Sequence, residues 1–157
     1  MARKSQTGTQ HPNSKLEFAE IRRRLRRSGA GRLFGFELIS IGKDRAVLSM
    51  LIRGWHKQVH GVVHGGVVAA IADTAGAMAV YSMLPRGARL ATIEMKINYL
   101  EPLDRGRISA EARILRLGQN TAVVECEVRD PNGNLAAKAL MTFAVMRRQG
   151  GGDSGRH

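Results

Sequence analysis

Residues 64–81 read HGGVVAAIADTAGAMAVY. After the two glycines, nearly every side chain is small or apolar, which predicts a helix from Gly65 to about Leu84, stopped by Pro85. We expect this helix to be buried, because a helix that is apolar on all sides has no face that prefers water. Asp73 stands near its middle and is the only acidic or basic side chain in the stretch other than the leading histidine.

Two roles are open for Asp73, because burying an unpaired carboxylate costs several kcal/mol or raises its pKa. It could accept hydrogen bonds for a purely structural purpose, or it could take part in catalysis. A membrane span is disfavoured, since the run is built from Ala and Gly rather than Leu and holds a central acid. A polar, glycine-rich set directly upstream favours a functional site: Gln58, His60, Gly61, His64, Gly65 and Gly66.

The composition fits a single domain of 157 residues with a sizeable core. The one cysteine, Cys126, lies on the apolar face of an alternating run, so we expect an ordinary core thiol. No second apolar run is long enough to span a membrane, and no signal-peptide core stands near the start. We therefore expect a cytoplasmic protein without a membrane span.

The net charge of +12 belongs largely to the ends of the chain. Residues 1–30 hold eight basic and two acidic side chains, residues 31–146 hold fourteen and ten, and residues 147–157 hold three and one. An excess of positive charge in residues 31–146 would indicate a polyanion-binding protein. Positive charge concentrated at the two ends of the chain gives less information about partners. Aromatic residues make up only 4% of the chain, which disfavours stacking platforms for nucleic acid.

The first 30 residues read as a basic extension with one short amphipathic helix. Residues 1–13 have no periodicity and are predicted to be disordered. Ser14 and Glu17 have the spacing of a capping box, and apolar residues recur from Phe18 to Leu25 at helical intervals, so the helix is expected to end near Gly29. We interpret its arginine face as solvated, with an anionic membrane or nucleic acid as the alternative. That face holds Arg22, Arg23, Arg24, Arg26 and Arg27.

In the main domain, residues 31–147, apolar and polar residues alternate on both sides of the helix in the sequence, which predicts strands. Residues 148–157 are predicted to form a flexible tail. A hairpin is predicted from 33–41 and 46–52, and four further strands from 92–99, 108–117, 121–129 and 135–145. A slip of phase at 115–117 predicts a bulge. The connections between the last four strands are too short for crossovers, so these strands must be antiparallel. They can bury one long helix only if the sheet curls around it.

The spaced motif Gln58-x-x-Gly61-x-x-His64-Gly65-Gly66, with Asp73 nine residues after His64, resembles the PaaI-like branch of the hotdog acyl-CoA thioesterases. Further matches are Asn98-Tyr99-Leu100-Glu101-Pro102 and Asp130-Pro131-Asn132-Gly133, so that the resemblance covers residues 33–146. It implies an α+β hotdog fold, in which an antiparallel sheet of five to six strands curls around one long central helix, with a short N-terminal helix added here.

The resemblance also implies a homodimer, or a homotetramer, with acyl-CoA sites at the dimer interface. The backbone N–H of Gly65 would polarise the thioester carbonyl, which agrees with the positive end of a helix where an oxyanion develops. His64 would shape the glycine turn. Asp73 of the other subunit would act as general base or nucleophile, and Gln58 would orient water or substrate. No metal and no cofactor is expected, because coenzyme A is part of the substrate.

Three further residues are candidates for substrate binding. Gly66 belongs to the same turn, Thr92 could supply a hydroxyl that holds water, and Arg116 is similar in position to cationic residues that meet the CoA phosphates in relatives. Two features depart from the family pattern. The chain pairs Asp73 with Gln58, whereas an aspartate here commonly accompanies asparagine, and Ala77 lacks a hydroxyl that some members carry. We hypothesise that the longer amide recovers the reach lost at the shorter acid.

Three other functions remain open. A zinc site could use His56, His60, His64 and Asp73, although the glycines among them argue against one helical face, and a lone histidine of this loop is more often a surface residue. A hydratase or dehydratase on the same fold would need a paired acid and base. A non-catalytic acyl-CoA-binding or sensor module is the third. Walls rich in Ala and Val suit an apolar or aryl acyl group.

Overall fold

The computed structural model describes residues 15–147. Helices α1 (Lys15–Arg27) and α2 (Gly29–Phe34) come first, followed by strands β1 (Glu37–Gly42) and β2 (Arg45–Leu51). The short 3-10 helix η1 (Gly54–His56) and the long helix α3 (Gly65–Tyr81) come next. The chain continues with β3 (Arg89–Tyr99), β4 (Arg107–Leu117), β5 (Thr121–Arg129) and β6 (Leu135–Met146). The predictions of a Ser14 cap, of disorder in residues 1–13 and of a flexible tail at 148–157 concern residues outside the described range.

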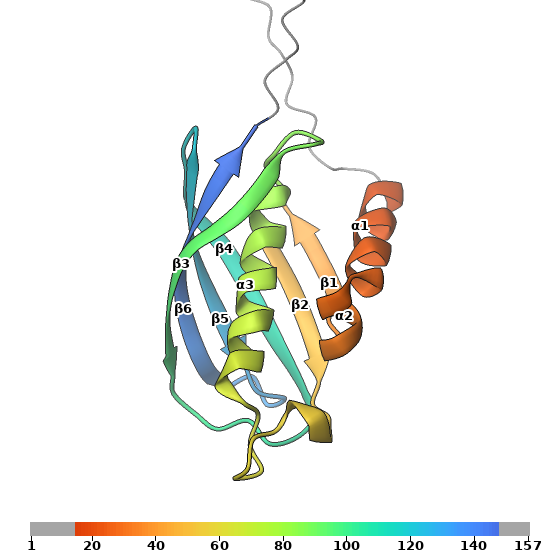
Figure 1. Ribbon diagram of the computed structural model, residues 1–157, viewed down its shortest axis with the longest axis vertical. Coiled ribbons are helices and arrows are strands. Elements are labelled where there is room, and N and C mark those ends of the chain that lie inside the picture. The colour runs from red at the N-terminus through yellow and green to blue at the C-terminus, as the bar shows by residue number, and fades with distance from the viewer. Residues whose placement is uncertain (1–14, 148–157) are drawn as a thin grey trace, which may run out of the picture.

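The six strands form one antiparallel sheet in the order β1-β2-β4-β5-β6-β3. Figure 1 shows α3 lying along one face of this sheet, with α1 and α2 beside it at the β1 end. The predicted fold is therefore confirmed. The order in space differs from the order in the chain at one point, because β3 pairs with β6 while the 100–106 connection carries the chain across to β4.

Small side chains let α3 come close to the sheet. The helix packs mainly against β2, β4 and β5, and its inner face is fully buried. A side chain at Gly76 would bring a Cβ atom to 2.9 Å from Met141 Cε and 3.0 Å from Phe143 Cζ, both on β6. The glycine is thus required by close approach, not by an unusual backbone conformation. The buried positions of the helix are Val67, Val68, Ile71, Ala72, Ala75, Gly76, Ala79 and Val80.

The expectation that α3 is buried on all sides is wrong for the single chain. A stripe at helical spacing is only half-buried, because β3 curves along this side of the helix with few contacts to it. The stripe consists of Ala69, Ala70, Asp73, Thr74, Ala77 and Met78, and exposed Tyr81 continues it at the end of the helix. The helix also ends earlier than expected, at Tyr81. The Ser82 hydroxyl donates to the carbonyl oxygen of Ala79 at 2.6 Å, within this last turn.

The strand predicted from Leu33 begins later, because residues 29–34 form α2. Ser28 caps this helix by accepting a hydrogen bond from the Gly31 N–H at 3.0 Å. Gly35 ends it in the left-handed conformation, with φ of 68°. These local capping signals outweigh the alternation of apolar residues that suggested a strand. The arginine-rich helix α1 was placed correctly, and it packs on β1.

The predictions for the strands after α3 are confirmed in detail. The register of β4 against β5 shifts between Ile114 and Arg116, which is the predicted bulge. Cys126 is fully buried, and this burial raises the pKa of its thiol to about 12. None of the helices within residues 15–147 is long and apolar enough to cross a membrane.

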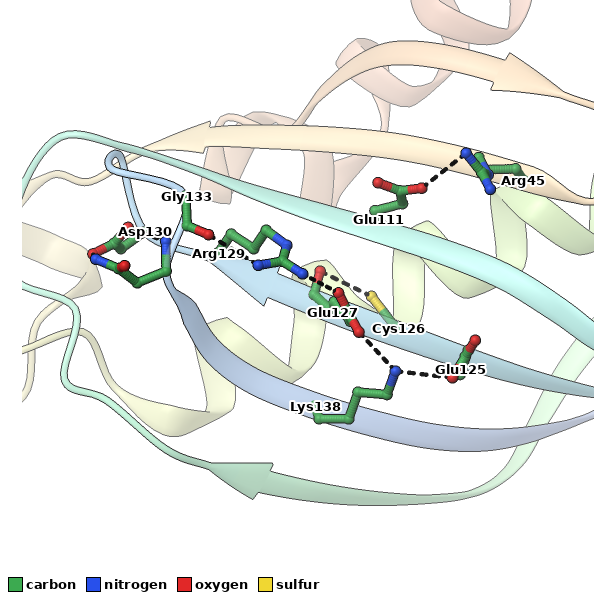
Figure 2. A network of polar contacts seen from close by, with 10 residues as sticks. Arg45, Glu111, Glu125, Cys126, Glu127, Arg129, Asp130, Gly133 and Lys138 are labelled. Carbon is green, nitrogen blue, oxygen red and sulfur yellow. Dashed lines mark hydrogen bonds and ion pairs between the residues drawn. The ribbon is translucent and has the colours of Figure 1, made fainter.

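The opposite face of the sheet is polar. Figure 2 shows that Lys138 on β6 reaches Glu125 and Glu127 on β5, at 2.8 and 2.9 Å, while Arg45 on β2 lies 3.2 Å from Glu111 on β4. Cross-strand ion pairs of this kind suit a face exposed to water and contribute little free energy individually. The apolar core therefore lies on the α3 side alone.

We predict that Gly31→Ala lowers the free energy of unfolding by about 1–3 kcal/mol, because a Cβ at this buried position would overlap the backbone carbonyl oxygen of Leu25. Gly29→Ala is the matched control, since a Cβ there meets nothing within 4 Å. Urea titration of both variants measures the difference. Equal stability of the two proteins would show that the α1–α2 corner is not packed as described.

Candidate active site

The N-terminus of α3 presents one backbone N–H that is free to bind a substrate. His64 is the N-cap, and its Nδ1 accepts a hydrogen bond from the Gly66 N–H at 2.9 Å. Its carbonyl oxygen accepts from the Val67 N–H at 2.9 Å. The Gly65 N–H, in contrast, donates to no acceptor within residues 15–147. A free N–H at the positive end of a helix is suited to stabilise negative charge on an oxygen.

Tyr99, at the end of β3, holds this turn in place. Its hydroxyl donates to the Gly65 carbonyl oxygen at 3.0 Å. Its ring lies so close that a Cβ on Gly65 would stand 3.1 Å from Tyr99 Cζ. In the sequence, Tyr99 is part of the motif at residues 98–102, and its spacing indicates no role in the site. Its contact with Gly65 depends on a pairing of β3 with α3 that spacing alone does not reveal.

The loop before α3 is fixed by His56. The carbonyl oxygen of His56 accepts from the His64 N–H at 2.8 Å, and its Nδ1 accepts from the Arg53 N–H at 3.1 Å. The side chain is 1% exposed, so the expectation of a surface histidine is wrong here. Burial, together with the charge of Arg53, lowers the pKa of His56 and favours its neutral form. His56 therefore acts as a structural support for the turn.

Gln58 belongs to the same loop and forms no hydrogen bond with Asp73 of its own chain. Its side-chain oxygen accepts a hydrogen bond from the backbone N–H of His60. Its amide nitrogen donates to no acceptor in the described part of the chain, so this N–H₂ group remains available.

Asp73 lies on the half-buried stripe of α3 and faces β3. The Thr92 hydroxyl on β3 donates to Asp73 Oδ1 at 2.8 Å. No described residue hydrogen-bonds the second carboxylate oxygen, Oδ2. The carboxylate is thus neither enclosed by hydrocarbon nor satisfied on both oxygens, which corrects the picture of a fully buried acid. Thr92 was a candidate from the sequence, and the structure brings it together with Asp73.

Within one chain the candidate residues fall into separate groups. Gln58, His64, Gly65 and Gly66 lie in or next to the turn that starts α3, whereas Asp73 is eight residues farther along the same helix, about 12 Å at 1.5 Å per residue.

Arg116 lies near the end of β4 that is remote from the loop before α3. It is nine residues along β4 from the strand end that pairs with Leu51, which places it about 30 Å away along the strand. No group of three or more His, Cys, Asp or Glu side chains that could hold a metal is found among residues 15–147.

An apolar cavity of about 250 Å³ opens beside Gly65. It lies between the start of α3, the end of β3 and the segment that leads to β4. Its position next to the free N–H makes it the natural place for the part of a substrate that adjoins a carbonyl group. The lining residues include Val62, Val68, Tyr99, Leu100, Pro102 and Leu103.

Known proteins that are similar to this chain indicate its family. Residues 60–137 match the model of the thioesterase superfamily. A Saccharolobus solfataricus protein named "Putative esterase" is 33% identical over 121 residues, which are 75% of this chain and 86% of that protein. The 1,4-dihydroxy-2-naphthoyl-CoA hydrolase of Escherichia coli is 27% identical over 75% of this chain and 89% of its own.

A solved structure gives the same result. An asparagine-to-aspartate mutant of the phenylacetic acid degradation protein PaaI from Thermus thermophilus superposes with a TM-score of 0.68 and 29% identity, covering 74% of this chain and 98% of that chain. The segment that matches the thioesterase superfamily model, residues 60–137, contains the glycine turn, Asp73 and Thr92. The resemblance seen in the sequence is thus confirmed, and the chain belongs to the hotdog thioesterase superfamily, whose members related to it include PaaI and an acyl-CoA hydrolase.

Proposed function

We propose that the protein hydrolyses the thioester of an apolar or aryl acyl-CoA, at sites that two copies of the chain build together. The observation that carries this proposal is the separation of the two chemical groups on α3. An oxyanion donor at Gly65 and a carboxylate at Asp73 about 12 Å away cannot both touch one carbonyl group. A second copy that runs antiparallel to the first would set the Asp73 of one chain against the Gly65 of the other.

The surface of the single chain supports such a pairing. β3 is an edge strand of 11 residues, which is long for an uncovered edge, and several apolar side chains on it are exposed. Ile93 is 57% and Tyr99 53% exposed. The half-buried stripe of α3, with Asp73, lies on the same side. A partner that covers β3 would therefore bury both surfaces and complete the site. A dimer is the smallest assembly that meets this need.

The chemistry follows from the free groups. Asp73 Oδ2 would take a proton from a water molecule, whose oxygen attacks the thioester carbonyl carbon. The Gly65 N–H would stabilise the oxyanion that forms. When the tetrahedral intermediate collapses, the carbon–sulfur bond breaks, coenzyme A leaves as a thiolate, and the proton held by Asp73 returns to it. If Asp73 attacks directly, an anhydride forms first and water hydrolyses it.

The remaining residues would have supporting roles. Thr92 would orient the carboxylate through its hydrogen bond to Oδ1. His64 and Tyr99 would hold the turn, and the free amide of Gln58 would orient water or substrate. Gly66 gives the turn room, since a Cβ there would lie 3.0 Å from His64 Nδ1. No cofactor is required, and we also propose a cytoplasmic location.

We predict that Asp73→Asn lowers kcat for acyl-CoA hydrolysis by about 10²–10⁴-fold, because the amide cannot accept a proton. Thiol release from a panel of aliphatic and aryl acyl-CoAs, measured in parallel for both proteins, tests this. Asp104→Asn is the matched control, since Asp104 is exposed in the 100–106 connection. Equal turnover in the Asp73 variant would refute the catalytic assignment, and absence of hydrolysis by the unmodified protein would favour a binding module.

Gln58→Ala is expected to reduce kcat or raise KM, because it removes the amide proposed to orient water or substrate. His60→Ala is the comparison, since Gln58 contacts the backbone of His60 and not its side chain. Steady-state kinetics on the best acyl-CoA of the panel measures both. If the Gln58 variant keeps the turnover and KM of the unmodified protein, the amide has no part in the reaction.

Ile93→Glu should convert a dimer into monomers and abolish hydrolysis, because it places a charge on the β3 edge where the partner is expected to pack. Leu115→Glu is the control, since Leu115 is similarly exposed, at 52%, but lies on β4. Sedimentation equilibrium and activity are measured on the same samples. A monomeric unmodified protein that hydrolyses acyl-CoA would contradict the two-chain site.

A further inference from the structure

A second cavity, of about 190 Å³, lies on the other side of the loop that supports the catalytic turn. It forms where α2, the start of β1, the end of β2 and η1 meet. The apolar cavity beside Gly65 shares none of its residues. Its walls combine guanidinium groups with aromatic rings, and the lining residues include Arg32, Phe34, Glu37, Arg53, Trp55 and Arg107.

The charge of this cavity favours an anion. Three arginines face a single carboxylate, that of Glu37, which Arg107 already pairs at 2.9 Å. Arg32 and Arg53 are exposed, and neither forms an ion pair with any residue between 15 and 147. Two guanidinium groups are thus left for a ligand. Arginine is the side chain best suited to bind phosphate, because its planar fork can donate two parallel hydrogen bonds.

Trp55 gives the cavity a second kind of contact. It is the only tryptophan of the chain, and 71% of its side chain is exposed although indole rings are mostly buried in folded proteins. The ring is held by an edge contact with His56, at 5.7 Å between centroids and 75° between planes. An exposed and oriented indole beside unpaired arginines is typical of surfaces on which a nucleobase stacks.

His56 also lines the cavity, and its ring carries a buried N–H without a partner among the described residues. Because Nδ1 of His56 accepts from the Arg53 N–H, the proton of the neutral ring lies on Nε2. This Nε2 is the one buried side-chain nitrogen or oxygen in the described chain without a hydrogen-bond partner. This nitrogen is itself enclosed, so the groups that a ligand in the cavity can reach are the guanidinium groups and the indole ring of Trp55.

We propose that this cavity binds the phosphate-bearing adenosine end of a nucleotide, with the base on Trp55 and phosphate on Arg32 and Arg53. Its volume is below the roughly 300–1,000 Å³ of pockets that enclose a whole ligand, which fits one end of a longer molecule. His56 adjoins Trp55 and accepts from the His64 N–H, so the cavity and the Gly65 turn share one loop. The nucleotide of coenzyme A is one source, which rests on the proposed function, and a free adenine nucleotide is the other.

The single tryptophan makes binding directly measurable. Titration with adenosine 3′,5′-bisphosphate is expected to quench Trp55 fluorescence in a saturable way, whereas pantetheine is not. Arg32→Ala and Arg53→Ala should each weaken the apparent Kd by roughly tenfold, because each removes a charged contact to phosphate. Arg86→Ala is the matched control, an exposed arginine in the turn after α3. A bisphosphate titration without saturable quenching overturns the proposal.

Kinetics identify the source of the nucleotide. If the site takes the nucleotide of coenzyme A, Trp55→Ala should raise KM for acyl-CoA by about tenfold or more and leave kcat unchanged, while hydrolysis of the matching acyl-pantetheine stays the same. If a free nucleotide is the ligand, bisphosphate still quenches Trp55, but coenzyme A does not compete and the KM of the variant is unaltered. Both results support the site.

The two proposals fail separately. The fluorescence titration needs no turnover, so saturable quenching in a protein that hydrolyses no acyl-CoA would leave the nucleotide site standing and refute the thioesterase assignment. Hydrolysis of acyl-CoA without any quenching, and with an unchanged KM in Trp55→Ala, would refute the nucleotide site and leave the thioesterase assignment standing. Because Trp55 is exposed, its replacement should not disturb folding, and calorimetric titration of this variant with the bisphosphate should show no binding.

Discussion

Close packing of α3 against the curved sheet is the constraint on which the rest of the molecule depends. The helix can approach because its inner face carries Ala, Val and Gly, and at Gly76 even a methyl group would press on Met141 and Phe143. Interiors packed this densely leave little freedom for sliding or rotation. The position of each residue along the helix is therefore fixed relative to the strands. The Gly65 N–H at its N-terminus and the Asp73 carboxylate in its middle are thus held at defined positions.

The same rigid helix divides the proposed chemistry between its start and its middle. Gly65 offers a free N–H at one end, Asp73 offers a carboxylate oxygen two turns later, and about 12 Å of helix keeps them apart. Because β3 leaves one side of α3 partly open, the carboxylate faces outward toward an edge strand instead of into the core. The proposed second copy of the chain would cover this edge strand and complete the proposed site.

The loop from Arg53 to His64 connects two surfaces of different chemistry. On one side it presents the glycine turn and an apolar cavity, and on the other the arginines and Trp55. His56 links them, since its backbone holds His64 and its ring is fixed by Arg53. An acyl-CoA molecule has the same division, with an apolar acyl group at one end and a phosphorylated nucleotide at the other. In the proposed complex, residues of one short loop would contact both ends of the same substrate molecule.

Local signals in the sequence determined the elements of this protein. The alternation of the strands, the glycine turn, the small residues of 64–81 and the slip of phase at 115–117 predicted a curled antiparallel sheet around a helix, because such patterns follow from the geometry of one segment at a time. Tertiary structure decided what depends on contacts between segments. The pairing of β3 with β6, the hydroxyl of Tyr99 on Gly65, the support given by buried His56 and the half-open position of Asp73 beside Thr92 all join residues distant in the chain. No periodicity encodes such contacts, since they arise only when the sheet closes over the helix.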